Sequence, residues 1–359
     1  MEPYSRTRAG VMLGHDLKGS FLRRAVLRCC FVVAMLCLSQ PLFAQQIQIA
    51  FGSCASLEYP QPIWSTIADL KPDLFVTLGD IVYSDTEDMT QMREAYAQMD
   101  TVVSFKALRS ICPVEGIWDD HDYGENDGGA SYPKREEVQK IFLDFLGEPK
   151  DSPRRASPGI YDVMYLGPDN RIQLILLDTR FFRSQWVKDD VTRMRYRPVY
   201  DRDLTMLGDA QWVWLEDQLT RPADVRIIAS GVQVVNDGHG YECWGNFPLE
   251  RDRLFQVIKK TKAEGVLFIS GDRHFAELSA MDGGVGYPMY DFTSSGMTHS
   301  AIDGIKAPNN KRVGAPFGEL NFGVIGVDQN ALTLELRDVK GEVRFSHQIE
   351  LDELRYKTR

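Results

Sequence analysis

Cysteine is scarce in this 359-residue sequence, and its distribution limits the chemistry that the residue can perform. Six cysteines are present, of which Cys29, Cys30 and Cys37 lie near the N-terminus. An even disulfide framework is therefore not expected in the remaining chain, which keeps only Cys54, Cys112 and Cys243. Two of these could pair, leaving a third that is free or bound to metal. We expect Cys54 to be the unpaired one, because it follows the first strand.

Long apolar runs are also lacking. Beyond the N-terminal region, no segment reaches the roughly 18–20 apolar residues that a membrane-spanning helix needs. Residues 1–44 carry Arg23-Arg24, a short apolar stretch over 29–38 and the small-residue site Phe43-Ala44. This pattern predicts a signal peptide and export to the periplasm or the extracellular space, by the Sec or the twin-arginine route. An uncleaved N-terminal anchor is the alternative. Residues 45–359 are expected to form a single domain.

Positive charge is in deficit as well. The formal net charge is -10 and the isoelectric point is near 5.2. No lysine or arginine cluster follows residue 30, so a nucleic acid is not expected as a partner. An acidic protein can still bind phosphate when metal ions supply the positive charge.

Three catalytic signatures are missing. The sequence contains no Gly-x-Ser-x-Gly nucleophile elbow, which argues against a serine hydrolase. It also contains neither a Walker loop nor a Gly-x-Gly-x-x-Gly fingerprint, which disfavours nucleotide-driven and dinucleotide chemistry.

Buried strands alternate with helices along most of the chain. We expect strands over residues 47–51, 74–78, 114–118, 172–177, 226–231 and 266–270, and helices over 64–70, 89–108, 134–146, 210–219 and 248–262. Alternating β segments are expected from Tyr290 onwards, with an antiparallel β meander over about 318–352. Two packed sheets in one domain is the simplest fold for this order of elements.

Three of the expected strands end in an aspartate. Asp80 follows the strand over 74–78, Asp120 follows 114–118 and Asp272 follows 266–270. His121 and His274 stand within two residues of these aspartates. Because ligands bind at the carboxyl ends of strands in open α/β sheets, we expect these tips to converge on one metal centre.

The neighbouring residues indicate the kind of metal. Tyr83 could supply a phenolate, which is a strong ligand for iron(III), and Cys54 could supply a thiolate, which suits iron or zinc. The alternatives are a tyrosine on the edge of the core, a small buried cysteine, and a turn or cap role for Asp80.

The acidic segment 119–122 surrounds one histidine with three carboxylates, which would repel one another unless cations lie among them. We expect one aspartate to ligate metal, and His121 either to ligate or to act as general acid. Asn126 could add an amide oxygen to a calcium site or simply occupy a turn. Arg180 could clamp phosphate or pair with Asp178. His239 and His299 lie in polar loops and rank below this set.

The motifs that carry these residues resemble, in order, those of the alkaline phosphatase D (PhoD-like) family of metallophosphoesterases. The matching segments are Phe51–Cys54, Leu78–Tyr83, Trp118–Asp122, Leu177–Arg180, Leu207–Leu215, Trp244–Arg251 and Ser270–His274. The resemblance implies an α/β fold, a four-layer αββα sandwich of two mixed sheets.

The resemblance also implies a site that contains Fe³⁺ and Ca²⁺, with another divalent metal as the alternative. Cys54, Asp80 and Tyr83 are then expected to bind iron, with Asp80 bridging to calcium. Asp120, Asn126, Asp272 and His274 are the candidates for the remaining ligand positions.

These observations predict a secreted metal-dependent phosphoesterase that attacks small-molecule, lipid or polymer phosphate esters with metal-activated hydroxide. His121 is the expected proton donor, and Arg180 is a phosphate-binding or structural residue. A phosphodiesterase or phospholipase activity at the same site is one alternative. A secreted protein that binds metal or phosphate without turnover is the other.

Overall fold

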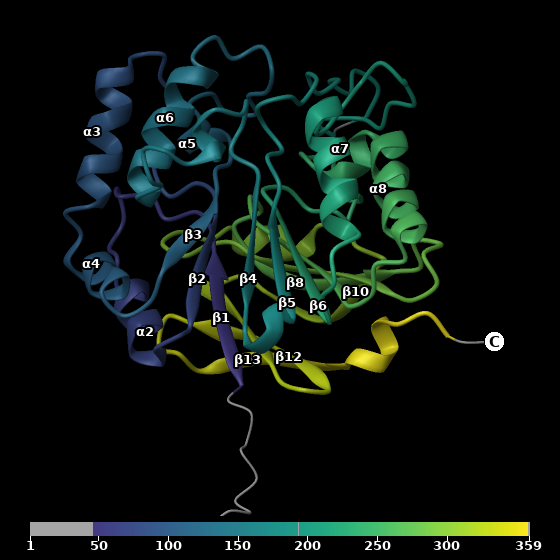
Figure 1. Cartoon of the computed structure of the whole chain (residues 1–359). Coiled ribbons are helices and arrows are strands. Elements are labelled where there is room, and N and C mark those ends of the chain that lie inside the picture. Colours follow the sequence, from purple (N-terminus) through teal and green to yellow (C-terminus); the bar gives the residue numbers. More distant parts are fainter. Residues whose placement is uncertain (1–45, 193, 358–359) are drawn as a thin grey trace, which may run out of the picture. The chain divides into compact units, whose positions relative to one another are not determined.

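The computed structural model describes residues 46–192 and 194–357, which form two β-sheets flanked by helices (Figure 1). The signal peptide expected over residues 1–44 lies outside the described residues. Phe51 and Phe292 pack edge to face with ring centroids 5.3 Å apart, and they belong to different sheets. The core between the sheets is therefore apolar, which drives their face-to-face packing.

The first sheet has six strands in the order β13-β12-β11-β1-β2-β3. Its strands are β1 (Ile47–Gly52), β2 (Leu74–Leu78), β3 (Val114–Ile117), β11 (Asn321–Val327), β12 (Ala331–Asp338) and β13 (Val343–Glu350). β1, β2 and β3 run parallel, whereas β11 to β13 form an antiparallel meander joined to β1. The parallel strands consequently place their carboxyl ends at one edge of the sheet.

The second sheet has seven strands in the order β10-β8-β9-β7-β6-β5-β4. Its strands are β4 (Asp162–Leu166), β5 (Ile172–Leu176), β6 (Val225–Ser230), β7 (Val266–Ser270), β8 (Ala276–Met281), β9 (Met289–Ser294) and β10 (Arg312–Phe317). β5, β6, β7 and β9 run parallel. Parallel strands buried on both faces read as continuous apolar runs, which is why β5, β6 and β7 were predictable from the sequence.

Helices cover the sheets and complete the four layers of the predicted αββα sandwich, which is confirmed (Figure 1). The longer helices are α2 (Ile63–Leu70), α3 (Met89–Met99), α4 (Val103–Arg109), α6 (Arg135–Leu146), α7 (Gly208–Leu219) and α8 (Pro248–Thr261). α6 packs on β3 and contacts α3, while α7 packs beside α8 near the second sheet. A four-residue helix, α5 (Asp120–Tyr123), starts directly after β3.

The helix predicted over 89–108 is wrong in its continuity, because the chain breaks between α3 and α4. Thr101 donates its hydroxyl hydrogen to the carbonyl oxygen of Gln98 at 2.7 Å. Such local side-chain bonding to the backbone competes with helix propagation. The sequence pattern missed β4 and β8. β8 carries buried Glu277 and Ser279, so it shows no apolar run.

Cys54, Cys112 and Cys243 are all buried and unpaired, so no disulfide forms between described residues. No helix within the described residues is both long enough and apolar enough to span a membrane.

Candidate metal centre

The carboxyl ends of β1, β2, β3 and β7 bring the predicted site residues to one place. Cys54 follows β1, Asp80 follows β2 and Asp120 opens α5 after β3. From the second sheet, β7 leads into Asp272 and His274. The site therefore lies where the two sheets meet, as the end-of-strand positions of these residues predict.

Four of these residues have backbone conformations that non-glycine residues avoid. The φ angles are 64° for Cys54, 55° for Asp80, 66° for Asp272 and 58° for His274. Left-handed conformations of this kind cost on the order of 1–3 kcal/mol each and persist where the surrounding structure requires them. Here they turn the chain sharply at the strand ends, which brings the side chains together.

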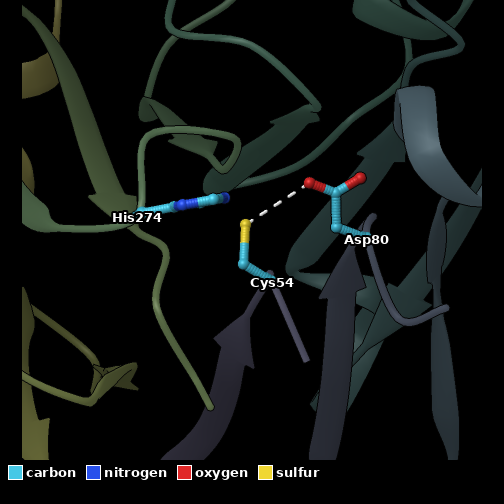
Figure 2. A group of neighbouring side chains, drawn as sticks. All are labelled: Cys54, Asp80 and His274. Atoms are coloured by element: carbon cyan, nitrogen blue, oxygen red, sulfur yellow. Dashed lines mark hydrogen bonds between the residues drawn. The ribbon is translucent and has the colours of Figure 1, made fainter. Parts of the chain in front are cut away.

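Cys54, Asp80 and His274 form the inner group (Figure 2). One ligand atom from each lies within 4.8 Å of the others, and the Cys54 thiol donates to Asp80 Oδ2 at 3.4 Å. Ser295 supports both ends of the group: its hydroxyl lies 3.1 Å from the Cys54 sulfur and accepts the backbone N–H of His274 at 2.7 Å. Ser295 thus links Cys54, which follows a strand of the first sheet, to His274, which follows a strand of the second.

Tyr83 stands beside this group. Its hydroxyl lies 3.5 Å from Asp80 Oδ2 and 3.2 Å from Nε2 of His299. The His299 ring also packs edge to face against His274, with centroids 4.4 Å apart. His299 thus lies beside the inner group, and the polar run that follows β9 was the available signal for this position.

Asp120 and His121 form a second group with Asp80, with one ligand atom of each within 4.8 Å of the others. Asp80 belongs to both groups, which is the placement required of a bridging ligand. Nδ1 of His121 lies 2.7 Å from a carboxylate oxygen of Asp85. The contact to Asp85 leaves Nε2 as the ring nitrogen available to the cleft.

Electrostatics make this arrangement costly without cations. Burial, together with the charges of Cys54 and Asp120, raises the pKa of Asp80 well above its usual value. Burial, followed by the charges of Cys54 and Asp80, likewise raises the pKa of Tyr83. A cation placed among these groups would favour their ionised forms and reverse both shifts.

In His121 a raised pKa favours the charged form of the side chain, whereas in Asp80 and Tyr83 it favours the neutral form. Burial favours its neutral ring, but the hydrogen bond to Asp85 and the charge of Asp120 raise the pKa of His121 to about 9. In the metal-free protein the ring is therefore a positively charged imidazolium at neutral pH.

Asp119 and Asp122, the other two aspartates of the acidic segment, make hydrogen bonds that hold the surrounding loops. Asp122 accepts the backbone N–H groups of Asp119 at 2.6 Å and of Ile81 at 3.2 Å. These bonds tie the loop after β3 to the loop after β2. Of the three carboxylates around His121, Asp120 is thus the one placed toward the metal groups.

Arg180 is fully buried and lies beneath the site. Its guanidinium donates to Asp119 Oδ1 at 2.7 Å and to both carboxylate oxygens of Glu242, at 2.7 and 2.9 Å. The predicted Asp178 contact is made by the backbone N–H of Arg180, at 2.9 Å, and not by an ion pair. Because its donors are engaged with carboxylates, Arg180 is placed to position the loop that carries Asp120.

A cleft of about 630 Å³ opens above these groups and is lined by Asp120, His121, Asp272 and His274. Exposed Asn126 also lines it.

Two further residues, Asp127 and Glu242, were not predicted from the sequence, and they form a third group of potential ligand atoms with Asp120. No local pattern marks Glu242, because it lies in an irregular loop far from any strand end.

The donor set fits resident metal ions. A thiol, a phenol, imidazoles and buried carboxylates converge, and Asp80 is shared between two groups. Thiolate and phenolate suit a transition metal, and the carboxylate-rich group suits a hard divalent cation.

Two sheets with helices on both sides and a metal-ligand cluster at the strand ends define the class of metallophosphoesterase-like proteins. The model of the family of PhoD-like phosphatases matches residues 49–312. The chain therefore belongs to the PhoD-like phosphatase family.

The sequence identity to individual members of the family is low. Alkaline phosphatase D of Bacillus subtilis is 23% identical over 277 residues, which cover 64% of this chain and 46% of that protein. This chain thus spans about half the length of that curated relative.

Solved structures share the fold. A structure of PhoD superposes with a TM-score of 0.71 at 19% identity, covering 87% of this chain and 72% of the other. A dimetal phosphatase from Danio rerio gives a TM-score of 0.52 at 13% identity, covering 85% of this chain and 99% of the other.

Proposed function

We propose that this chain is an exported, metal-dependent phosphoesterase that hydrolyses phosphate esters. The observation that carries the proposal is that Asp80 lies in two groups of potential ligand atoms, with Cys54 and His274 in one and with Asp120 in the other. Two adjacent cation positions with one bridging carboxylate are the arrangement that a two-metal phosphoester hydrolase requires. Membership of the PhoD-like phosphatase family supports the same activity.

The proposed ligands divide by chemistry. Cys54, Asp80 and Tyr83 would hold iron(III), since thiolate and phenolate are strongly donating ligands. Asp80 would also contact calcium, and the oxygen and nitrogen donors proposed to complete the site are Asp120, Asn126, Asp272 and His274. When bound, the cations supply positive charge for the phosphate and lower the pKa of water.

The chain's own residues perform the remaining tasks. His121 lies beside the metal groups with its Nδ1 engaged by Asp85, and we assign its Nε2 the transfer of a proton to the leaving oxygen. Arg180 acts as a positioning residue through Asp119 and Glu242. Export rests on the predicted signal over residues 1–44, followed by a single catalytic domain over 45–359.

The first experiment is elemental analysis and a visible spectrum of the purified protein. Iron bound to tyrosinate or thiolate gives a charge-transfer colour, which Tyr83→Phe or Cys54→Ser should remove. Cys112→Ala is the matched control, because that cysteine is buried beside β3 and away from the site. Colourless protein that contains only zinc would overturn the iron assignment but leave a metal-dependent hydrolase.

Kinetics then test the activity itself. Hydrolysis of p-nitrophenyl phosphate supports the monoesterase, and a preference for bis-p-nitrophenyl phosphate would shift the assignment to a phosphodiesterase. Tight phosphate binding without turnover of either ester at any pH would favour the non-catalytic alternative.

A further inference from the structure

A wall of the cleft carries two buried nitrogen atoms that lack partners among the described residues. They are Nε2 of His239 and Nε of Arg273, and both residues line the same cleft as Asp272 and His274. His239 is only 7% exposed. Buried polar groups are almost always hydrogen-bonded, so these two nitrogens are available to donate to a group bound in the cleft.

The loop that carries His239 is firmly held. Arg251 donates to Asp237 Oδ2 at 2.8 Å, and Lys311 forms a second ion pair with the same carboxylate. The backbone N–H groups of Arg195 and Tyr196 both donate to the carbonyl oxygen of Gly240 at 3.0 Å. His239 is therefore fixed between these contacts, and its unpaired nitrogen is not the result of a loose loop.

The tautomer of His239 follows from its neighbour. The backbone N–H of Tyr241 donates to Nδ1 at 3.1 Å, so Nδ1 is the acceptor and Nε2 carries the hydrogen. Burial and the nearby charge of Arg273 lower the pKa of His239 to about 3, which keeps the ring neutral. Nε2 is thus a hydrogen-bond donor.

Arg273 supplies positive charge at the same place. Its guanidinium lies 4.3 Å from the ring centroid of Tyr241, outside the inner metal group. The other cations that line the cleft have acidic partners: Arg195 pairs with Asp127, and Lys306 pairs with Asp303 at 2.6 Å. Arg273 makes one longer contact, 3.3 Å to Asp272, which we propose as a metal ligand. Its charge is therefore the least compensated in the cleft.

We infer that His239 and Arg273 form a subsite that binds an anionic oxygen on the leaving group of the ester. The inference rests on the proposed phosphoesterase function and adds a substrate class, namely phosphate monoesters whose alcohol carries a carboxylate or a second phosphate. The reacting phosphate belongs at the Asp80 groups, and the cleft of about 630 Å³ is large enough for the rest of such a molecule.

The test compares two substrates that differ mainly in one charge. 3-Phosphoglycerate carries a carboxylate where glycerol 3-phosphate carries a hydroxymethyl group. With the metal-loaded full-length protein, kcat/KM should be about tenfold higher for 3-phosphoglycerate, since a charge-assisted hydrogen bond contributes about that factor. The difference should appear mainly in KM.

Variants locate the effect. Arg273→Met and His239→Leu should each reduce the preference toward about one, and His239→Gln should restore part of it because the amide keeps a donor. Arg197→Met is the matched control, since it removes an exposed charge that does not line the cleft, and it should keep the preference. Thermal unfolding of each variant identifies any that fail to fold.

Three results would overturn the inference. If wild type hydrolyses p-nitrophenyl phosphate but shows no preference between the two glycerol derivatives, the subsite assignment fails and the proposed function stands. The subsite assignment also fails, with the proposed function intact, if Arg273→Met and His239→Leu lose equal activity on both substrates. If wild type hydrolyses none of these esters, the proposed function fails and the subsite falls with it.

Discussion

Asp80 and Asp178 occupy equivalent positions in the two sheets, yet their surroundings differ sharply. Asp80 follows β2 and Asp178 follows β5 closely, and both carboxylates are buried. Asp178 accepts four N–H groups at 2.9–3.0 Å, from the Trp118 indole and from three backbone amides. Asp80 has only long contacts, at 3.4–3.5 Å, to Cys54, Tyr83 and the backbone of His121.

This difference separates a structural carboxylate from a ligand. Burial raises the pKa of Asp178, and four hydrogen bonds to its charged form offset part of that rise without a cation. Asp80 lacks such donors and lies beside other acidic groups, so its charge is compensated only when a cation binds. The number of short donors around a strand-end aspartate thus indicates its role better than the strand-end position does.

The largest expected effect comes from Asp80→Asn. Turnover should fall by a factor on the order of 10³ or more, as expected when a principal electrostatic group is lost. The metal content should fall as well. The metal-free variant should nevertheless unfold at the same denaturant concentration as metal-free wild type or a higher one, because a costly buried carboxyl has been replaced by a neutral amide.

Removing the metal with a chelator extends the comparison between wild type and Asp80→Asn. Wild type should lose about 3 kcal/mol of unfolding free energy on metal removal, the effect of a ligand present at about 100 times its Kd. Asp80→Asn should lose much less. Equal destabilisation of both proteins by the chelator would contradict the ligand role of Asp80.

The second prediction concerns His121, which follows the strand end of β3. His121→Gln should slow hydrolysis of an alkyl phosphate by about 100-fold, because the poor leaving group needs a proton. p-Nitrophenyl phosphate should be affected far less, since nitrophenolate leaves without protonation. Measured kcat values for both esters decide the point, and equal losses would assign His121 a ligand or positioning role instead.

The sequence made most of the fold predictable, because the buried parallel strands are continuous apolar runs. The sequence was less informative where a strand buries polar side chains that are paired with one another. β8 carries Glu277, whose carboxylate accepts hydrogen bonds from Arg312 and Gln233. The same limit applies to the site. Strand-end aspartates were visible in the sequence, but Glu242 is brought to Asp120 by long-range contacts through Arg180, which no local pattern encodes.

The smallest expected effect concerns Asp178, the strand-end aspartate that is held by hydrogen bonds. Asp178→Asn keeps the shape of the side chain but replaces one acceptor oxygen with a donor, so at least one of the four N–H groups loses its partner. Urea unfolding should show a loss of about 2 kcal/mol, the cost of leaving one buried donor unsatisfied. Metal content should stay near the wild-type level, because Asp178 is not among the grouped ligand atoms of the described residues. If Asp178→Asn instead lost metal and kept its stability, short donors around a strand-end aspartate would no longer distinguish a framework carboxylate from a ligand.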